Sequence, residues 1–193
     1  MSSQYLLWID GVGGFLVCLG NRLTLGQAKP DGQVDIPIYA DVSSHHATLT
    51  RDSEGYMLEA VRRVQVNGKD TTRVLLQPQD RITLGSSCQM IFRQPVAASA
   101  SAKLDVVSGH RLRLSVDGIL LMADTLVLGP GSQAHVSMPD LKQPVLLYRN
   151  KNQLGVSYAG GLSIGGVPVK DRGMIVPGAA VQGEDFSLAL ENA

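Results

Sequence analysis

The 193-residue chain has few cysteines and aromatic residues and no surplus of charge of either sign. Its two cysteines, Cys18 and Cys88, are too few for a secreted disulfide framework and lack the paired spacing of a zinc site, so we expect two buried thiols. Residues 1–95 hold nine basic and nine acidic side chains, and residues 96–193 hold eight of each. This balance argues against a nucleic-acid partner, because a protein that binds phosphate backbones needs an excess of Lys and Arg.

Long apolar runs are also absent. The first short run, YLLWI at 5–9, stops at Asp10, and no basic residue precedes it. We therefore expect neither a signal peptide nor a membrane span, no membrane partner and a cytoplasmic location.

The apolar residues occur in runs of three to six that end at Gly, Pro, Asp or Asn, and no window sustains the i, i+3, i+4, i+7 pattern of an amphipathic helix. The sequence therefore predicts an all-β fold, with about ten short strands in the first half, spaced as in a sandwich. We expect these strands near residues 5–9, 15–19, 22–25, 35–39, 47–51, 56–60, 64–66, 73–76, 81–84 and 88–93.

The chain repeats its own pattern after an uncharged stretch rich in Ala and Ser, QPVAASASA at 94–102. Residues 112–131 parallel residues 6–27, each as two strands around an Asp-Gly turn followed by a strand that ends in Leu-Gly, and residues 162–190 parallel residues 64–92. We therefore predict two copies of one β-domain, 1–95 and 103–193, joined by a linker at 96–102.

The segment VSSHHATL at 42–49 holds the most informative polar side chains. A Ser nucleophile with a His base is conceivable, but neighbouring residues of an extended segment point to opposite sides, and only Asp41 and Asp52 are near enough in sequence to orient a histidine. The same divergence of His45 and His46 argues against a metal site. We expect no enzyme activity, no metal and no cofactor.

Four ordered segments resemble the forkhead-associated (FHA) domain: LTLGQ at 23–27, SSHHA at 43–47, VNGK at 66–69 and QDRITLG at 79–85. The resemblance covers nearly all of residues 1–95. It implies an FHA-like β-sandwich of eleven strands, and it suggests that the loops at one end bind phosphothreonine peptides.

Several residues match functional positions of that family. Ser43 matches the serine whose hydroxyl binds the phosphate, and Ser44 stands where the family often has a basic residue. His46 matches a structural histidine that braces the binding loops, so it should be largely buried. Asn67 matches the second Asn-Gly of the motif, which ties the loops together, and Gly68 should have a positive φ in a tight turn.

Two departures bear on phosphate binding. Gly26 matches the family's glycine, but Gln27 replaces the phosphate-clamping arginine that follows it, and Arg62 and Arg63 replace the first Asn-Gly. An arginine–phosphate hydrogen bond contributes about 1.5–3 kcal/mol, so its loss would weaken binding by one to two decades. Arg62 and Arg63 could supply the missing charge. The alternative is that they form a solvated strand edge that prevents aggregation.

The second copy departs further from the family, with Pro130 at the arginine position, no Ser-x-x-His at 137–149 and Gly165 in place of the asparagine. We therefore expect a degenerate FHA-like sandwich there. Two hypotheses for the whole chain follow. The first is a protein-interaction module whose N-terminal domain binds threonine-phosphorylated partners. The second is a phosphate-independent scaffold or homo-oligomerisation unit that keeps the fold without the pocket.

Overall fold

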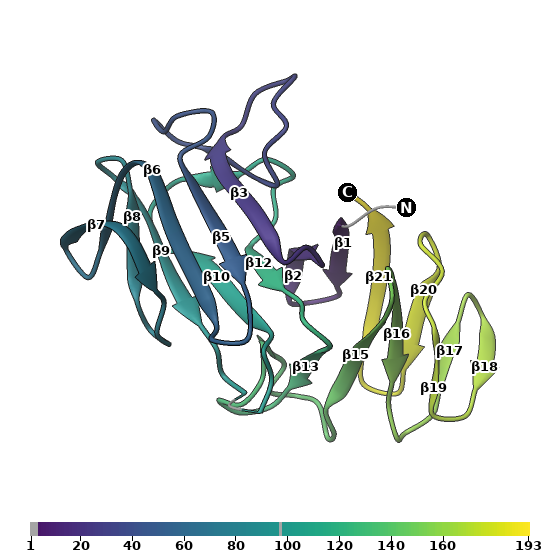
Figure 1. Cartoon of the computed structure of the whole chain (residues 1–193). Coiled ribbons are helices and arrows are strands. Elements are labelled where there is room, and N and C mark those ends of the chain that lie inside the picture. The colour runs from purple at the N-terminus through teal and green to yellow at the C-terminus, as the bar shows by residue number, and fades with distance from the viewer. Residues whose placement is uncertain (1–3, 97) are drawn as a thin grey trace. The chain divides into compact units, whose positions relative to one another are not determined.

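The computed structural model describes residues 4–96 and 98–193, and within these residues it contains strands and turns but no α-helix (Figure 1). The predicted all-β fold is therefore confirmed. None of the described residues lies in a helix that could cross a membrane.

Contacts divide the chain into two compact units, each built from segments of both halves. The first unit comprises Met1–Leu19, Gln94–Ala102 and Leu120–Ala193, and the second comprises Gly20–Arg93 and Lys103–Ile119. This division differs from the predicted boundaries 1–95, 96–102 and 103–193, because residues before Gly20 group with the C-terminal half and residues 103–119 group with the N-terminal half.

The second unit is formed by nine strands together with the first residues of a tenth. They are β3 (Arg22–Gln27), β4 (Ile36–Tyr39), β5 (Ala47–Arg51), β6 (Tyr56–Val66), β7 (Lys69–Leu75), β8 (Arg81–Leu84), β9 (Cys88–Arg93), β10 (Ala102–Val106), β11 (Arg111–Leu112) and β12 (Gly118–Leu121). Their order is β11-β4-β3-β5-β6-β8-β9-β10-β12, and β7 pairs with β6.

The first unit places the strands of the C-terminal half beside the N-terminal hairpin. One sheet has the order β2 (Gly13–Cys18), β1 (Gln4–Ile9), β21 (Ser187–Asn192), β20 (Ala180–Gly183), β17 (Leu162–Ile164), β18 (Val167–Val169). The other has the order β14 (Val136–Ser137), β13 (Thr125–Gly129), β15 (Val145–Asn150), β16 (Gln153–Ser157), β19 (Arg172–Met174).

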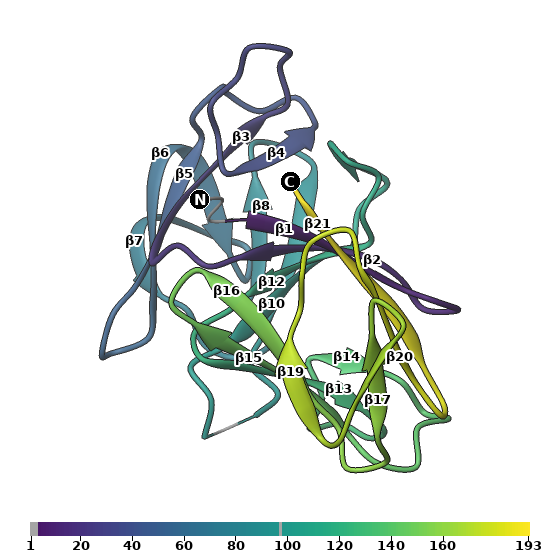
Figure 2. The ribbon, with the colours of Figure 1, turned by 90° about the vertical axis from the view of Figure 1, so that its right-hand side faces the viewer.

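Two strand pairings explain why the units mix the halves of the chain. In the first unit β1 pairs with β21, with Leu7 opposite Leu190 (Figure 2). In the second unit β10 pairs with β9, with Leu104 opposite Phe92. Phe92 and Leu190 occupy matching positions in the sequence repeat, so each unit pairs this last strand with a strand that comes from the other half of the chain.

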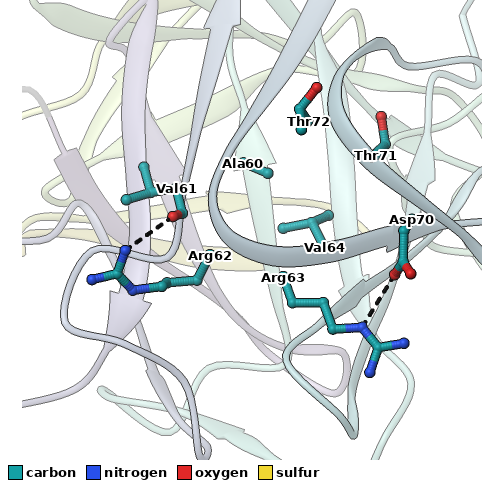
Figure 3. Close-up of a pocket in the computed structure, with 8 residues that line it drawn as sticks. All are labelled: Ala60, Val61, Arg62, Arg63, Val64, Asp70, Thr71 and Thr72. Carbon is teal, nitrogen blue, oxygen red and sulfur yellow. Dashed lines mark hydrogen bonds and ion pairs between the residues drawn. The ribbon is translucent and has the colours of Figure 1, made fainter.

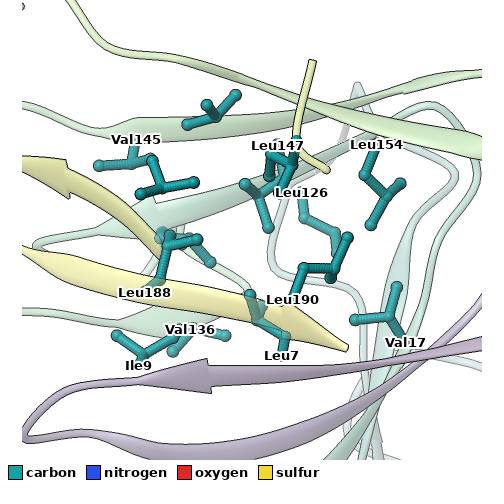
Figure 4. Close-up of a cluster of buried hydrophobic side chains, with 14 of the residues drawn as sticks. Leu7, Ile9, Val17, Leu126, Val136, Val145, Leu147, Leu154, Leu188 and Leu190 are labelled. Atoms are coloured by element: carbon teal, nitrogen blue, oxygen red, sulfur yellow. The ribbon is translucent and has the colours of Figure 1, made fainter. Parts of the chain in front are cut away.

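Both units bury the apolar faces of these strands. Leu7, Ile9 and Val17 lie in one cluster with Leu188 and Leu190 in the first unit (Figure 4). In the second unit Leu104 and Leu112 are buried, although they come from the C-terminal half. Burying a leucine contributes about 1.5–3 kcal/mol, so the segments taken from the other half are part of each core. Cys18 and Cys88 are both buried and form no disulfide, as predicted.

Most predicted strands are present, with two informative differences. Residues 56–60 and 64–66 form one strand, β6, because its pairing with β7 shifts register between Glu59 and Val64 rather than ending there. The strand expected before the Asp117-Gly118 turn is reduced to the two residues of β11, and the residues before it form β10, which pairs with β9.

Candidate functional site

The candidate site lies in the second unit, where the end of β3 passes close to the loop before β5. The amide of Gln27 donates to the carbonyl of Ser43 at 3.0 Å, and the amide of His46 donates to the carbonyl of Leu25 at 2.8 Å. A Cβ on Gly26 would overlap the carbonyl oxygen of Ser44 and would lie 2.6 Å from its carbonyl carbon. Only glycine permits this approach of two backbones, which explains why Gly26 stands here.

The side chain of His46 holds the loop 43–46 in place. It is 3% exposed, which confirms the predicted burial. Its Nδ1 accepts from the amide of Ser43 at 3.1 Å, and its Nε2 lies 2.8 Å from the carbonyl oxygen of Arg63 and 3.1 Å from the amide nitrogen of Gly85. The amide of Gly85 donates to the same carbonyl at 3.0 Å. One imidazole thus connects the 43–46 loop to the 61–63 segment and to the end of β8.

The loop presents two serine hydroxyls and an unexpected cation. Ser43 is half-buried, and its hydroxyl makes no hydrogen bond within residues 4–96 and 98–193. Ser44 is exposed, and its Oγ accepts from the Lys29 ammonium at 2.6 Å. The reasoning from sequence missed Lys29, although Lys29 is the only basic residue between Arg22 and Arg51. Gln27 is half-buried and contributes its backbone amide to the site.

Arg62 and Arg63 lie in the irregular part of β6, between Glu59 and Val64, and line a pocket of about 520 Å³. The amides of Val61 and Arg62 both donate to the carbonyl of His46, at 2.9 and 3.0 Å. This segment therefore adjoins the loop 43–46, the serine loop. The two arginine side chains extend away from each other (Figure 3). Arg62 bonds to the carbonyl of Val61 at 3.3 Å, whereas Arg63 pairs with Asp70 at 3.1 Å.

The Arg63–Asp70 pair lies on the surface. The hydrogen bond from Arg63 lowers the pKa of Asp70, so this carboxylate stays ionised near neutral pH. Both side chains are more than 60% exposed, and exposed ion pairs contribute little to stability. Arg63 can therefore leave Asp70 at small cost if a stronger anion arrives.

Asn67 and Gly68 form the tight turn between β6 and β7. Both have a positive φ, 52° and 79°, as a two-residue hairpin turn with Asn-Gly requires. The Asn67 side chain accepts from the amide of Arg81 at 3.0 Å and donates to Asp80 at 2.7 Å. Asn67 therefore ties this turn to the start of β8.

The geometry gives no support to nucleophilic catalysis at this loop. Neither His45 nor His46 bonds to the Ser43 or Ser44 hydroxyl, because His45 bonds to Thr48 at 2.9 Å and His46 is held by backbone groups. Within the described residues, no three His, Cys, Asp or Glu side chains come together as metal ligands would.

The corresponding place in the first unit lacks the serine hydroxyls and the histidine. There Gly129 ends β13, Pro130 follows it, and the segment before β15, 138–144, carries no Ser, Thr or His. Pro130 has no amide proton to donate.

A match to a family model decides what the second unit contains. Residues 23–85 match the model of the FHA domain. This segment is an FHA domain. The match spans β3 to the end of β8 and includes Gly26, the serine loop, His46 and the Asn67 turn, and it does not extend into the C-terminal half. An FHA domain is a protein-interaction module, so protein binding is the activity to consider at this site.

Two solved structures are similar to this chain. The FHA-2 domain of the Mycobacterium tuberculosis ABC transporter Rv1747 has 27% identity and a TM-score of 0.33, and the alignment covers 38% of this chain and 68% of that one. The N-terminal FHA domain of EssC, a component of the bacterial Type VII secretion apparatus, has 11% identity and a TM-score of 0.27, with 97% and 92% covered. No curated protein matches the sequence significantly.

Proposed function

We propose that the FHA domain of the second unit binds phosphothreonine peptides of a partner protein at the Ser43–Ser44 loop. The observation that carries this proposal is the contact of the Lys29 ammonium with Ser44 Oγ at 2.6 Å. It brings a cation to the loop whose arginine is missing at Gln27. The free hydroxyl of Ser43 is a second donor for a phosphate oxygen.

Two arginines can add to this charge. Arg62 makes no ion pair within the described residues, and its amide is anchored to the carbonyl of His46 beside the loop. Arg63 is held only by the exposed pair with Asp70. Charge-assisted hydrogen bonds to phosphate are about twice as strong as neutral ones, so Lys29 and one arginine would be enough to favour a phosphorylated over an unphosphorylated threonine.

We also propose that the first unit is a second, degenerate copy of the same fold. Its strand pairings match those of the second unit. β13 pairs with β14 in parallel, as β3 does with β4, and β13 pairs antiparallel with β15, as β3 does with β5. Pro130 has no amide donor, the segment 138–144 carries no Ser, Thr or His, and its one cation, Lys142, is paired with Glu184 and Asp185, so we assign this unit a structural or phosphate-independent role.

The test is fluorescence anisotropy with the full chain and a pool of labelled phosphothreonine peptides, compared with the same pool unphosphorylated. We expect binding of the phosphorylated pool only, and a tenfold or greater loss for Ser43→Ala. Ser53→Ala, on an exposed turn of the same unit, is the matched control and should bind normally. Equal binding of both pools would reject phosphate recognition.

The phosphate-independent scaffold is the second candidate for the whole chain. Two observations favour it: Gln27 carries no charge, and the Arg63 side chain is paired with Asp70. In that case both peptide pools would be inert, and light scattering would detect self-association of the chain.

A further inference from the structure

Residues 103–119, which come from the C-terminal half, add a short strand next to the candidate site. β11 pairs with β4, with Leu112 opposite Ile38 and Arg111 opposite Tyr39. Leu112 is 4% exposed and anchors the strand in the core. Successive side chains of a strand point to opposite faces, so Arg111 lies on the side opposite to Leu112, and Arg113 follows β11 in a turn.

A chain of contacts runs from this strand to the serine loop. The Arg113 amide donates to the carbonyl of Pro37 at 3.0 Å, and its guanidinium donates to the carbonyl of Lys29 at 3.3 Å. The Lys29 ammonium in turn donates to Ser44 Oγ at 2.6 Å. Arg113 is therefore separated from the serine loop by one lysine.

Lys29, Arg111 and Arg113 make no ion pair within the described residues. Asp31 and Asp41 are near Lys29 in sequence, and Asp117 lines a pocket together with Arg111. Tyr39, opposite Arg111, is 58% exposed. An exposed aromatic ring among unpaired arginines is typical of a surface that binds another protein.

We propose that Lys29, Tyr39, Arg111 and Arg113 form a basic ledge that binds acidic side chains of the partner peptide next to its phosphothreonine. This inference rests on the proposed function and adds a preference for Asp or Glu near the phosphorylated residue. An extended residue spans about 3.3–3.6 Å, so we place the acidic residues within three positions of the phosphothreonine. It also makes the binding surface depend on residues 111–113 of the C-terminal half.

The experiment compares phosphothreonine peptides that carry Glu or Gln at each of the three positions before and after the phosphothreonine, by anisotropy with the full chain. Exposed charge pairs are weak, so we expect Glu to tighten binding by about 2- to 5-fold at one or more positions. The gain should disappear in the double variant Arg111→Gln, Arg113→Gln. It should persist in Arg22→Gln, an exposed arginine at the far end of β3.

The outcomes separate this inference from the proposed function. Phosphopeptides that bind with no difference between Glu and Gln at any of the six positions, or a Glu preference that survives in the double variant, would overturn the basic ledge alone. Phosphopeptides that fail to bind at all would overturn both proposals. A Glu preference lost only in the double variant would support the ledge.

Discussion

The backbone contact at Gly26 can be tested by adding one methyl group. In Gly26→Ala, the new Cβ would overlap the carbonyl oxygen of Ser44, and it would lie 2.6 Å from the carbonyl carbon of Ser44 and 2.9 Å from the carbonyl oxygen of Ser43. All three atoms belong to backbone and cannot rotate away. The loop must therefore move from β3, or β3 must bend.

The expected cost has two parts. Overpacking a tight site costs about 1–3 kcal/mol, and loss of the hydrogen bond from Gln27 to the carbonyl of Ser43 adds about 1 kcal/mol. We therefore expect the free energy of unfolding to fall by about 2–4 kcal/mol. At a typical urea m-value of about 1–3 kcal/mol/M, the midpoint falls by about 0.7–4 M.

Urea unfolding followed by circular dichroism measures this change, and amide hydrogen exchange of residues 23–46 shows whether it is local. Gly109→Ala is the control, because a Cβ there meets no atom within 4 Å, and we expect a change below about 0.5 kcal/mol. Equal stability and equal exchange for Gly26→Ala and the wild type would refute the tight approach of β3 to the serine loop.

Three further predictions concern charge, pH and chain connectivity. Lys29→Gln should weaken phosphothreonine binding by about tenfold or more, because a charge-assisted bond to phosphate is lost, as anisotropy would show. Burial lowers the pKa of His135 in the folded protein, so the unfolded chain binds the extra proton first. The free energy of unfolding should thus fall as the pH drops below about 6.5, and His135→Gln should flatten this dependence in urea titrations. A protease site inserted after Val96 should give two fragments that still elute together in gel filtration, because each unit contains strands from both.

Each of these has a result that contradicts it. Unchanged phosphopeptide affinity in Lys29→Gln would remove this lysine from the site. An equally steep pH dependence in His135→Gln would assign the effect to another group. Separate elution of two folded fragments after cleavage would show that each half of the chain folds without the other.

The strands were predictable because each is a short apolar or alternating run between turn residues, as in YLLWI at 5–9 and RITL at 81–84. The partner of the strand at 5–9 was not predictable. Its apolar residues indicate a largely buried strand, but they do not say whether β9 or β21 is its neighbour, since Phe92 and Leu190 offer similar partners.

The candidate site was predictable where a motif fixes the backbone. The burial of His46 follows from the resemblance to the FHA motif, and the positive φ of Gly68 follows from the Asn-Gly turn. Lys29 and Arg113 could not be found in this way, because both reach the site through tertiary packing and belong to no motif. The opposite directions of the Arg62 and Arg63 side chains could not be predicted either, since they depend on the ion pair that Arg63 forms with Asp70.

The most direct test of phosphothreonine recognition is a two-dimensional amide NMR titration of the full chain. We predict that phosphothreonine peptides shift the amide signals of Lys29, Ser43, Ser44 and Arg62, and that the same peptides without phosphate leave those signals in place. Identical shifts with both peptide sets, or shifts confined to residues 120–193, would contradict the proposal.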